Sequence, residues 1–159
     1  MSVDQLEFRR VMGHFATGVT VISTHDGAGG LFGLTANAVA SVSLLPPMVL
    51  VCVDKQSDSH GSVAVSEVFA VNILSHSQET LSRRFAKSGG DKFAGIGYRL
   101  GVSGAPILED TLAHLECRLL HAFDAGDHTI YVGEAIDVAT GREEEPLLFF
   151  RGGYRNTAP

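Results

Sequence analysis

The sequence has no tryptophan, only two cysteines in 159 residues, and no long apolar stretch. Cys52 and Cys117 lie inside apolar segments and form no Cys-x-x-Cys pair, so we expect core thiols rather than a disulfide framework or a cysteine metal site. The longest apolar run, at 48–53, is far shorter than the roughly 20 residues of a membrane-spanning helix. The N-terminal residues MSVDQLEFRR lack the apolar core of a signal peptide, and we therefore expect a cytoplasmic protein.

Positive charge is scarce as well. Lysine and arginine total 12 against 18 acidic residues, which gives a formal net charge of −6 at pH 7. This balance disfavours nucleic acids and anionic membranes as partners, so a ligand that carries phosphate must be held by local geometry. The remaining composition, 45% hydrophobic and 19% charged, is that of an ordinary globular protein. The length predicts a single domain over residues 1–159.

Familiar catalytic and cofactor motifs are missing. The glycine-rich segments 27–33 and 95–101 do not follow a strand and open a helix, as a dinucleotide fingerprint must. The seven histidines include no His-Glu-x-x-His, and His114, His121 and His128 are spread over a hairpin, so we expect no metal site. No serine lies in a complete nucleophile elbow. These absences disfavour Rossmann, P-loop, metal-dependent and serine-hydrolase chemistry.

The hydrophobic pattern predicts a mainly β protein with a few peripheral helices. Strands are expected at 19–24, 35–44, 48–53, 69–75, 111–123, 128–140 and 146–150, and the continuously apolar strand 48–53 is expected to be buried on both faces. Helices are expected at 3–15, with Asp4 as the cap, at 61–68, and at 75–87, with a capping box formed by Ser75 and Gln78. In the strand 111–123, His114 and Glu116 are expected to face outward and Phe123 inward. The segment 91–110 shows no clear period and is expected to be a long loop. Short strands punctuated by turns favour a closed or nearly closed antiparallel barrel.

Two neighbouring segments indicate a ligand. The odd-numbered positions of 35–44 are mostly polar and the even-numbered ones apolar, which predicts a half-buried strand whose polar face suits a flat heteroaromatic group. The loop 54–60 brings hydroxyls, backbone N–H groups and basic side chains to the start of a predicted helix, as an anion site does. Each feature alone also fits a wet strand face or an ordinary turn. Their proximity favours a nucleotide-like ligand.

A histidine follows a Gly-Asp turn at the start of the strand 128–140. Gly133, inside this strand, predicts a close approach to the backbone. From these residues alone, two interpretations of His128 remain open. It is either a ligand-facing group at the mouth of the barrel or a surface residue that stabilises the turn through Asp127.

Several motifs occur in the order found in one known family. They are Gly13–Val21 (GHFATGVTV), Thr35-Ala36-Asn37 with Ser41-Val42-Ser43 and Pro46-Pro47, Phe85 with Asp91-Lys92-Phe93, and Gly126-Asp127-His128 with Gly133-Glu134. From about Phe8 to Tyr154 the chain resembles the flavin reductase-like family, whose fold is a split antiparallel β-barrel of the FMN-binding type. Its members include the reductase components of two-component monooxygenases that use diffusible flavin.

The resemblance implies a role for each matching position. It places five residues along the isoalloxazine ring, namely Thr35, Asn37, Ser41, Val42 and Ser43, and three beside it, namely Cys52, Val53 and Asp54. It places Lys55, Ser57 and Ser59 on the ribityl phosphate, with Arg84 and Phe85 at the same end. It places His128 near the nicotinamide, with Tyr154 as a companion. One departure is Ala38, where the family usually has serine. It leaves the tightness of the site and its flavin preference open.

The implied activity is that of an NAD(P)H-dependent flavin reductase that supplies reduced FMN or FAD to a partner monooxygenase. Hydride transfer between the two cofactors requires no acid, base or nucleophile from the protein, which agrees with the missing triad. The alternatives are a flavoenzyme that reduces another acceptor such as ferric chelates or a quinone, a flavin-binding electron carrier or sensor, and a structural dimerisation domain. FMN against FAD, and NADH against NADPH, stay open. The apolar N-terminal helix and strands predict a homodimer with the flavin near the interface.

Overall fold

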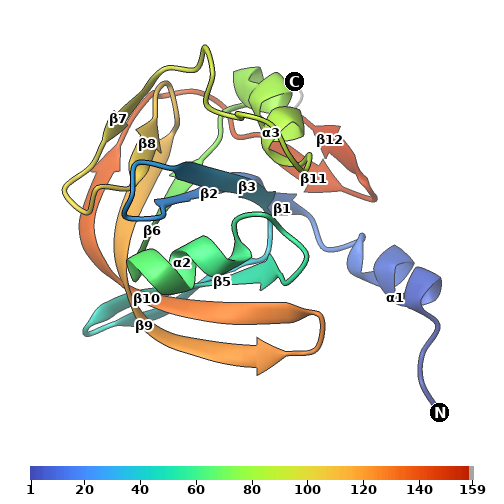
Figure 1. Cartoon of the computed structure of the whole chain (residues 1–159). Helices are drawn as coiled ribbons and strands as arrows, with labels where there is room; N and C mark the ends of the chain where they lie inside the picture. The colour runs from blue at the N-terminus through green and yellow to red at the C-terminus, as the bar shows by residue number, and fades with distance from the viewer. Residues whose placement is uncertain (158–159) are drawn as a thin grey trace.

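A curved, seven-stranded antiparallel sheet forms the body of the protein (Figure 1). The computed structural model describes residues 1–157. Its strands are β1 Thr17–Gly18, β2 Thr20–His25, β3 Leu31–Ala36, β4 Val39–Leu44, β5 Pro47–Asp54, β6 Val68–Ile73, β7 Tyr98–Leu100, β8 Pro106–Leu108, β9 Ala113–Ala125, β10 His128–Thr140, β11 Leu148–Phe150 and β12 Gly153–Arg155. Its helices are α1 Gln5–Met12, α2 His60–Ser66 and α3 Glu79–Phe85, with a 3₁₀ turn η1 at His76–Gln78. The predicted architecture, mainly β with peripheral helices, is confirmed.

The two edge strands of the large sheet are joined directly by the chain. The strand order is β3-β2-β6-β9-β10-β5-β4, so β3 and β4 lie at opposite edges although only Asn37 and Ala38 separate them. Three Cα–Cα steps span at most about 11 Å, so the two edges must meet at this point. The Cys52 N–H donates to the Ala38 carbonyl at 3.0 Å and ties the link to β5. Among the described residues no β3–β4 pairing closes the sheet, which is therefore a split barrel.

Two apolar clusters hold the sheet in shape. The cluster inside the barrel includes Ile22, Phe69 and Tyr131, and the second includes Phe85 of α3. Each of these side chains is at most 1% exposed, and burial of one such side chain stabilises the fold by about 1.5–3 kcal/mol. At Gly133 of β10, an added Cβ would lie 2.7 Å from Cζ of Phe69. The predicted close approach at Gly133 is confirmed, and the approaching group is a ring of the core.

The prediction of one continuous strand over 35–44 is wrong. The chain changes neighbours at the Asn37–Ala38 link, from β2 before it to β5 after it, and the register of β4 is irregular between Ser41 and Ser43. The predicted alternation therefore does not continue along β4. Val39, at an odd position, packs against the core, whereas the even-numbered Leu44 is 88% exposed. Apolar side chains of β4 are thus available to another surface.

The outward face of β9 is covered, contrary to prediction. His114 and Glu116 are 8% and 0% exposed. The segment 91–110, predicted to be an irregular loop, contains the hairpin β7–β8, and two backbone N–H groups of its turn donate to the Glu116 carboxylate. The prediction for Phe123 is also wrong, because this residue is 53% exposed near the end of β9. A polar face of a strand can therefore be buried when a second hairpin supplies hydrogen-bond partners.

Helix α1 stands apart from the body (Figure 1). Asp4 caps it as predicted, because its carboxylate accepts the N–H groups of Leu6 and Glu7 at 3.0 Å. None of its residues is buried. Its C-terminal end is held where the Arg151 N–H donates to the Gly13 carbonyl at 2.7 Å. The apolar face of α1 is therefore uncovered in a single chain.

The remaining helices are short. The predicted capping box of Ser75 and Gln78 is present, but it caps η1, and the following α3 ends at Phe85, two residues earlier than expected. Helix α2 begins after Ser59, whose side chain makes no capping hydrogen bond. In the part of the chain that the structure describes, no helix is long and apolar enough to cross a membrane.

Both cysteines are free thiols, but the prediction of a core thiol is confirmed only for Cys117 and is wrong for Cys52. Cys117 is fully buried, and burial raises the pKa of its thiol to about 12, so it is an inert group of the core. Cys52 is partly exposed on the other face of the sheet from the core, and burial also raises the pKa of its thiol. Neither residue is therefore a reactive thiolate.

Candidate functional site

A large cavity opens beside the barrel. Its volume is about 1920 Å³, and its wall is formed by α1, the segment 13–20, β4, β5 and the start of β10. The side chains of β5 alternate, since Val51 belongs to the core while Met48, Leu50 and Cys52 line the cavity. The prediction that β5 is buried on both faces is therefore wrong for one of them, because the face that lines the cavity is only half-buried. The cavity exceeds the roughly 300–1,000 Å³ of a typical small-molecule site, so a single small ligand leaves part of it free.

Five of the predicted site residues line this cavity. They are Asn37, Ser41, Ser43, Cys52 and His128. The last four belong to β4, β5 and β10, which are adjacent strands, and Asn37 belongs to the link that joins the sheet edges. Amide, hydroxyl and imidazole groups therefore stand in a wall that is otherwise mostly apolar. Such a wall orients a flat ligand through a few polar contacts.

His128 occupies the end of this wall, at the first residue of β10. Its Nδ1 lies 2.7 Å from Oδ1 of Asp127, and its ring also lines the cavity. The hydrogen bond from His128 holds the pKa of the Asp127 carboxyl below its usual range, so this acceptor stays ionised. His128 contacts Asp127 through Nδ1, as the turn-stabilising interpretation predicts, whereas a contact between Nε2 and a ligand stays a prediction.

The loop 54–60 is largely occupied with its own hydrogen bonds. The Asp54 carboxylate accepts the Gln56 N–H at 2.8 Å, and the Ser57 hydroxyl accepts the Ser59 N–H at 3.2 Å. Ser59 is 2% exposed. Lys55 points to the β9–β10 turn, where its Nζ donates to the Gly126 carbonyl at 2.6 Å. None of these residues belongs to the cavity wall, so their role on a phosphate stays a prediction.

The predicted residues near α3, which are Thr35, Arg84 and Tyr154, are not part of the cavity wall. The Thr35 hydroxyl donates to the Ser82 carbonyl at 2.6 Å, and the Tyr154 hydroxyl lies 2.7 Å from the Ser82 hydroxyl. The Arg84 guanidinium donates to the Ala94 carbonyl at 2.7 Å. These polar groups thus have partners within the chain. A ligand contact there requires that such bonds be exchanged or shared.

Three further predicted residues present little or nothing to the cavity. Val53 and Phe85 are 0% and 1% exposed in the two core clusters, so a ligand can reach them only through their backbone. Val42 is 45% exposed on β4 and is not part of the wall. The structure thus divides the predicted residues into a cavity group, the loop 54–60, the α3 side and the core.

Some residues of the wall were not predicted. The hydroxyl of Thr17 is the buried side-chain oxygen that lacks a hydrogen-bond partner within residues 1–157. Met48 and Leu50 are also in the wall, and the alternation along β5 was the signal that could have identified them. Phe8 reaches the wall from α1, which no pattern within the helix indicates. This unpaired hydroxyl, in the same wall as Asn37, Ser41 and Ser43, is a group that a bound ligand can satisfy.

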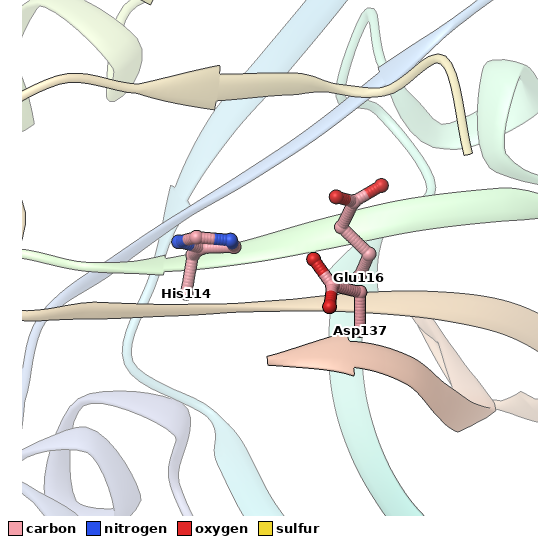
Figure 2. A group of neighbouring side chains, drawn as sticks. All are labelled: His114, Glu116 and Asp137. Atoms are coloured by element: carbon pink, nitrogen blue, oxygen red, sulfur yellow. The ribbon is translucent and has the colours of Figure 1, made fainter. Parts of the chain in front are cut away.

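A second polar cluster lies under the β7–β8 turn and consists of His114, Glu116 and Asp137 (Figure 2). Their potential ligand atoms lie within 4.8 Å of one another. The Glu116 carboxylate accepts the Ser103 hydroxyl at 2.6 Å and the Ser103 N–H at 2.8 Å. A guanidinium nitrogen of Arg99 lies 3.4 Å from His114 Nε2. Within this cluster, Glu116 therefore anchors the covering turn.

Burial and hydrogen bonding oppose each other at Glu116. Burial raises the pKa of its carboxyl, but hydrogen bonds from Ser103 and Val102 outweigh that effect and lower the pKa below its usual value. The residue is consequently a carboxylate at neutral pH. Its charge is stabilised by the turn that it holds.

The fold and the cavity together define a split-barrel protein with a site for a nucleotide-sized ligand. The family model described as "Flavin reductase like domain" matches residues 12–158. The chain therefore belongs to the flavin reductase-like family, in agreement with the resemblance of its motifs.

Individual relatives match over nearly the whole chain. The reductase subunit HsaB of a flavin-dependent monooxygenase from Rhodococcus jostii is 41% identical over 99% of this chain and 80% of that protein. The solved NADH:FAD oxidoreductase of Streptomyces globisporus, in complex with NAD and FAD fragments, is 41% identical with a TM-score of 0.92, over 98% of this chain and 94% of that one. Nitrilotriacetate monooxygenase component B from Mycobacterium thermoresistibile is 42% identical with a TM-score of 0.93, over 98% and 88%.

Proposed function

We propose that this chain is an NADH-dependent flavin reductase that supplies reduced flavin to a partner monooxygenase. The observation that carries the proposal is the convergence of Asn37, Ser41, Ser43 and His128 on one cavity in a chain that matches flavin reductases end to end. Relatives named as NADH-dependent FAD reductase and as monooxygenase reductase subunits support the same activity. The flavin is FAD or FMN.

The bound cofactors supply the redox chemistry, in which a hydride passes from nicotinamide C4 to flavin N5. The protein binds the nicotinamide and the flavin and orients them. Asn37, Ser41 and Ser43 donate and accept hydrogen bonds along the edge of the flavin, with Thr17 as a further partner. His128 positions the nicotinamide over it. The apolar residues of β5 and α1 exclude water from the two stacked rings, which favours the reactive geometry.

The loop 54–60 is proposed for the phosphate end, through Ser57 and backbone N–H groups, with Arg84 nearby. Thr35, Val53 and Asp54 contribute through their backbone or through exchanged hydrogen bonds. These assignments follow the family resemblance. A cytoplasmic location is part of the same proposal, because the free thiols stay reduced there.

A homodimer completes the proposal. Phe8 and Phe15 are 61% and 72% exposed, and Leu44 and Leu45 of the β4–β5 turn are 88% and 94% exposed. Exposed apolar groups of this size are unusual on a monomer, and a second copy is the natural partner for them. Light scattering at micromolar concentration should give twice the 16.9 kDa mass of the chain. A monomer mass would contradict this part of the proposal.

Turnover in air tests the activity. The purified protein is mixed with NADH and either FAD or FMN, and loss of NADH absorbance is followed. Sustained loss over many turnovers is expected, and the ratio of kcat/KM for the two flavins and for NADH against NADPH assigns the cofactors. Flavin that binds without NADH loss would instead indicate a carrier or sensor. Flavin that stays bound through gel filtration, with rapid reduction of ferric chelates or a quinone, would indicate the other enzyme.

A further inference from the structure

Lys55 is fixed to the hairpin turn that carries His128. Its Nζ donates to the Gly126 carbonyl at 2.6 Å and pairs with the Asp124 carboxylate, and its backbone N–H donates to the Asp127 carbonyl at 3.0 Å. These three contacts converge on the β9–β10 turn, namely on Asp124 near the end of β9 and on Gly126 and Asp127, the two residues between the strands. None of them is directed toward the serines of the loop 54–60.

Lys55 lies just beyond the end of the β5–β10 strand pairing, where no β5–β10 ladder hydrogen bonds hold the hairpin. The last β5–β10 pair joins Asp54 and His128, so Lys55 is the first residue beyond the ladder and reaches across to the turn. Asp124, Gly126 and Asp127 are exposed. An exposed ion pair alone contributes little, but here it acts with two hydrogen bonds to backbone carbonyls. Without the contacts of Lys55, the part of the hairpin beyond the β5–β10 pairing is held by β9–β10 pairing alone.

The β9–β10 turn sets the orientation of the His128 side chain. Its Nδ1 lies 2.7 Å from the Asp127 carboxylate, which leaves Nε2 for the cavity. The Asp127 carbonyl is the atom that the Lys55 N–H binds. A shift of Asp127 therefore moves both the backbone and the hydrogen-bond partner of the histidine.

We infer that Lys55 is a positioning residue for His128 rather than an anchor for the flavin phosphate. The inference rests on the proposed function, because it takes His128 as the group that meets the nicotinamide. Lys55 acts through the turn and touches neither cofactor. The opposing hypothesis is that Lys55 leaves Asp124 and binds phosphate when flavin enters.

The two hypotheses give opposite results for Asp124→Asn. If Lys55 holds the turn in place, Asp124→Asn and Lys55→Met both loosen the turn and raise the KM for NADH. Lys55→Arg then keeps the turn fixed and leaves the KM near that of the parent. If Lys55 is a phosphate anchor restrained by Asp124, Asp124→Asn frees the ammonium group and strengthens FMN binding relative to riboflavin, which lacks the phosphate. Lys55→Met then weakens FMN alone.

The experiment combines binding, kinetics and exchange. Dissociation constants for FMN and riboflavin come from quenching of flavin fluorescence, and the KM comes from NADH oxidation. For Lys55→Met we expect a rise in KM of about tenfold, typical of one lost positioning contact, with an unchanged ratio of the two flavin dissociation constants. Lys87→Met, at an exposed lysine after α3, is the matched control and should change neither quantity.

Hydrogen–deuterium exchange in the ligand-free protein provides a readout that does not depend on activity. The peptide covering 124–129 should exchange faster in Lys55→Met than in the parent or in Lys87→Met. Unchanged exchange, or a selective loss of FMN affinity, overturns the inference. If the parent does not oxidise NADH, the proposed function fails, and the exchange and flavin titrations still decide what Lys55 does.

Discussion

The side-chain amide of Asn72 donates to the hydroxyl of Ser23 at 2.8 Å in the interior of the protein. It also donates to the Val21 carbonyl at 3.0 Å, and its oxygen accepts the Leu108 N–H at 2.9 Å. Ser23 donates to the Pro106 carbonyl at 2.5 Å. Asn72 and Ser23 are both 0% exposed. A buried polar network therefore joins β2, β6 and β8, and it fastens the covering hairpin to the sheet.

Removal of this amide should be costly. We expect Asn72→Ala to lower the free energy of unfolding by about 2–4 kcal/mol, because it leaves the buried N–H of Leu108 without an acceptor, removes the amide that donates to Ser23 and to the Val21 carbonyl, and opens a small cavity. Urea denaturation measures the effect. The same change at the exposed Asn37 should alter stability by less than about 0.5 kcal/mol. Equal losses at the two positions would contradict the importance of the network.

A second prediction concerns the packing of β10. In Gly133→Ala the new Cβ would lie 2.7 Å from Phe69 Cζ and 2.8 Å from Cys117 Cβ, so core atoms must move and we expect a loss of about 1–3 kcal/mol. Gly61→Ala in α2 is the control, since nothing lies within 4 Å of its added Cβ and alanine favours the helix by up to about 1 kcal/mol. Thermal denaturation should show a lower Tm for the first variant and an equal or higher Tm for the second.

The third prediction is a pH dependence at Glu116. Its folded pKa is lowered below 4.5, so its contribution to stability is present above about pH 4.5 and is lost as the pH falls through the folded value. Glu116→Gln cannot titrate and turns an amide N–H₂ toward backbone donors, which should cost about 1–3 kcal/mol at pH 7. Urea denaturation from pH 7 to pH 3 should show the gap between the two proteins narrowing in acid. A constant gap would mean that the charge of Glu116 is not what the turn stabilises.

The fourth prediction tests His128 itself. His128→Ala should leave flavin affinity nearly unchanged and lower kcat/KM for NADH about tenfold, mostly through KM, because a positioning contact acts equally in the ground and transition states. Steady-state kinetics across pH provide the measurement. A fall in kcat with an altered pH profile would instead assign a proton-transfer role. Unchanged kinetics would leave His128 as a residue that only supports the turn.

The sequence predicts the β-rich class, most strand positions and the capping residues, because these depend on local periodicity and side-chain chemistry. It does not predict the break at Asn37 and Ala38, since the pattern of polar and apolar residues continues through it. Nor does it predict the burial of Glu116. That burial depends on a hairpin whose three-residue strands are too short to show a period.

The site is predicted in the same uneven way. The cavity wall includes Ser41, which the polar face of the predicted strand 35–44 indicates, Cys52, which the family resemblance indicates, and His128, whose motif marks a strand end. The orientation of Lys55 depends on the approach of a distant turn. A basic residue after a strand carries no information about such a contact, so the position of the loop before a predicted helix and the family resemblance indicate an anion site instead.

The direct link between the sheet edges restricts how this family member can vary. The turn at 26–30 can accept an insertion, because its neighbours are held by their own strand pairing. An extra residue between Asn37 and Ala38 would instead displace these two residues of the cavity wall. It would also allow the two edges of the sheet to move apart and the sheet to become less curved. Ligand preference at the Asn37–Ala38 link can consequently change through exchange of side chains, as at Ala38, but not through a change in the length of the link.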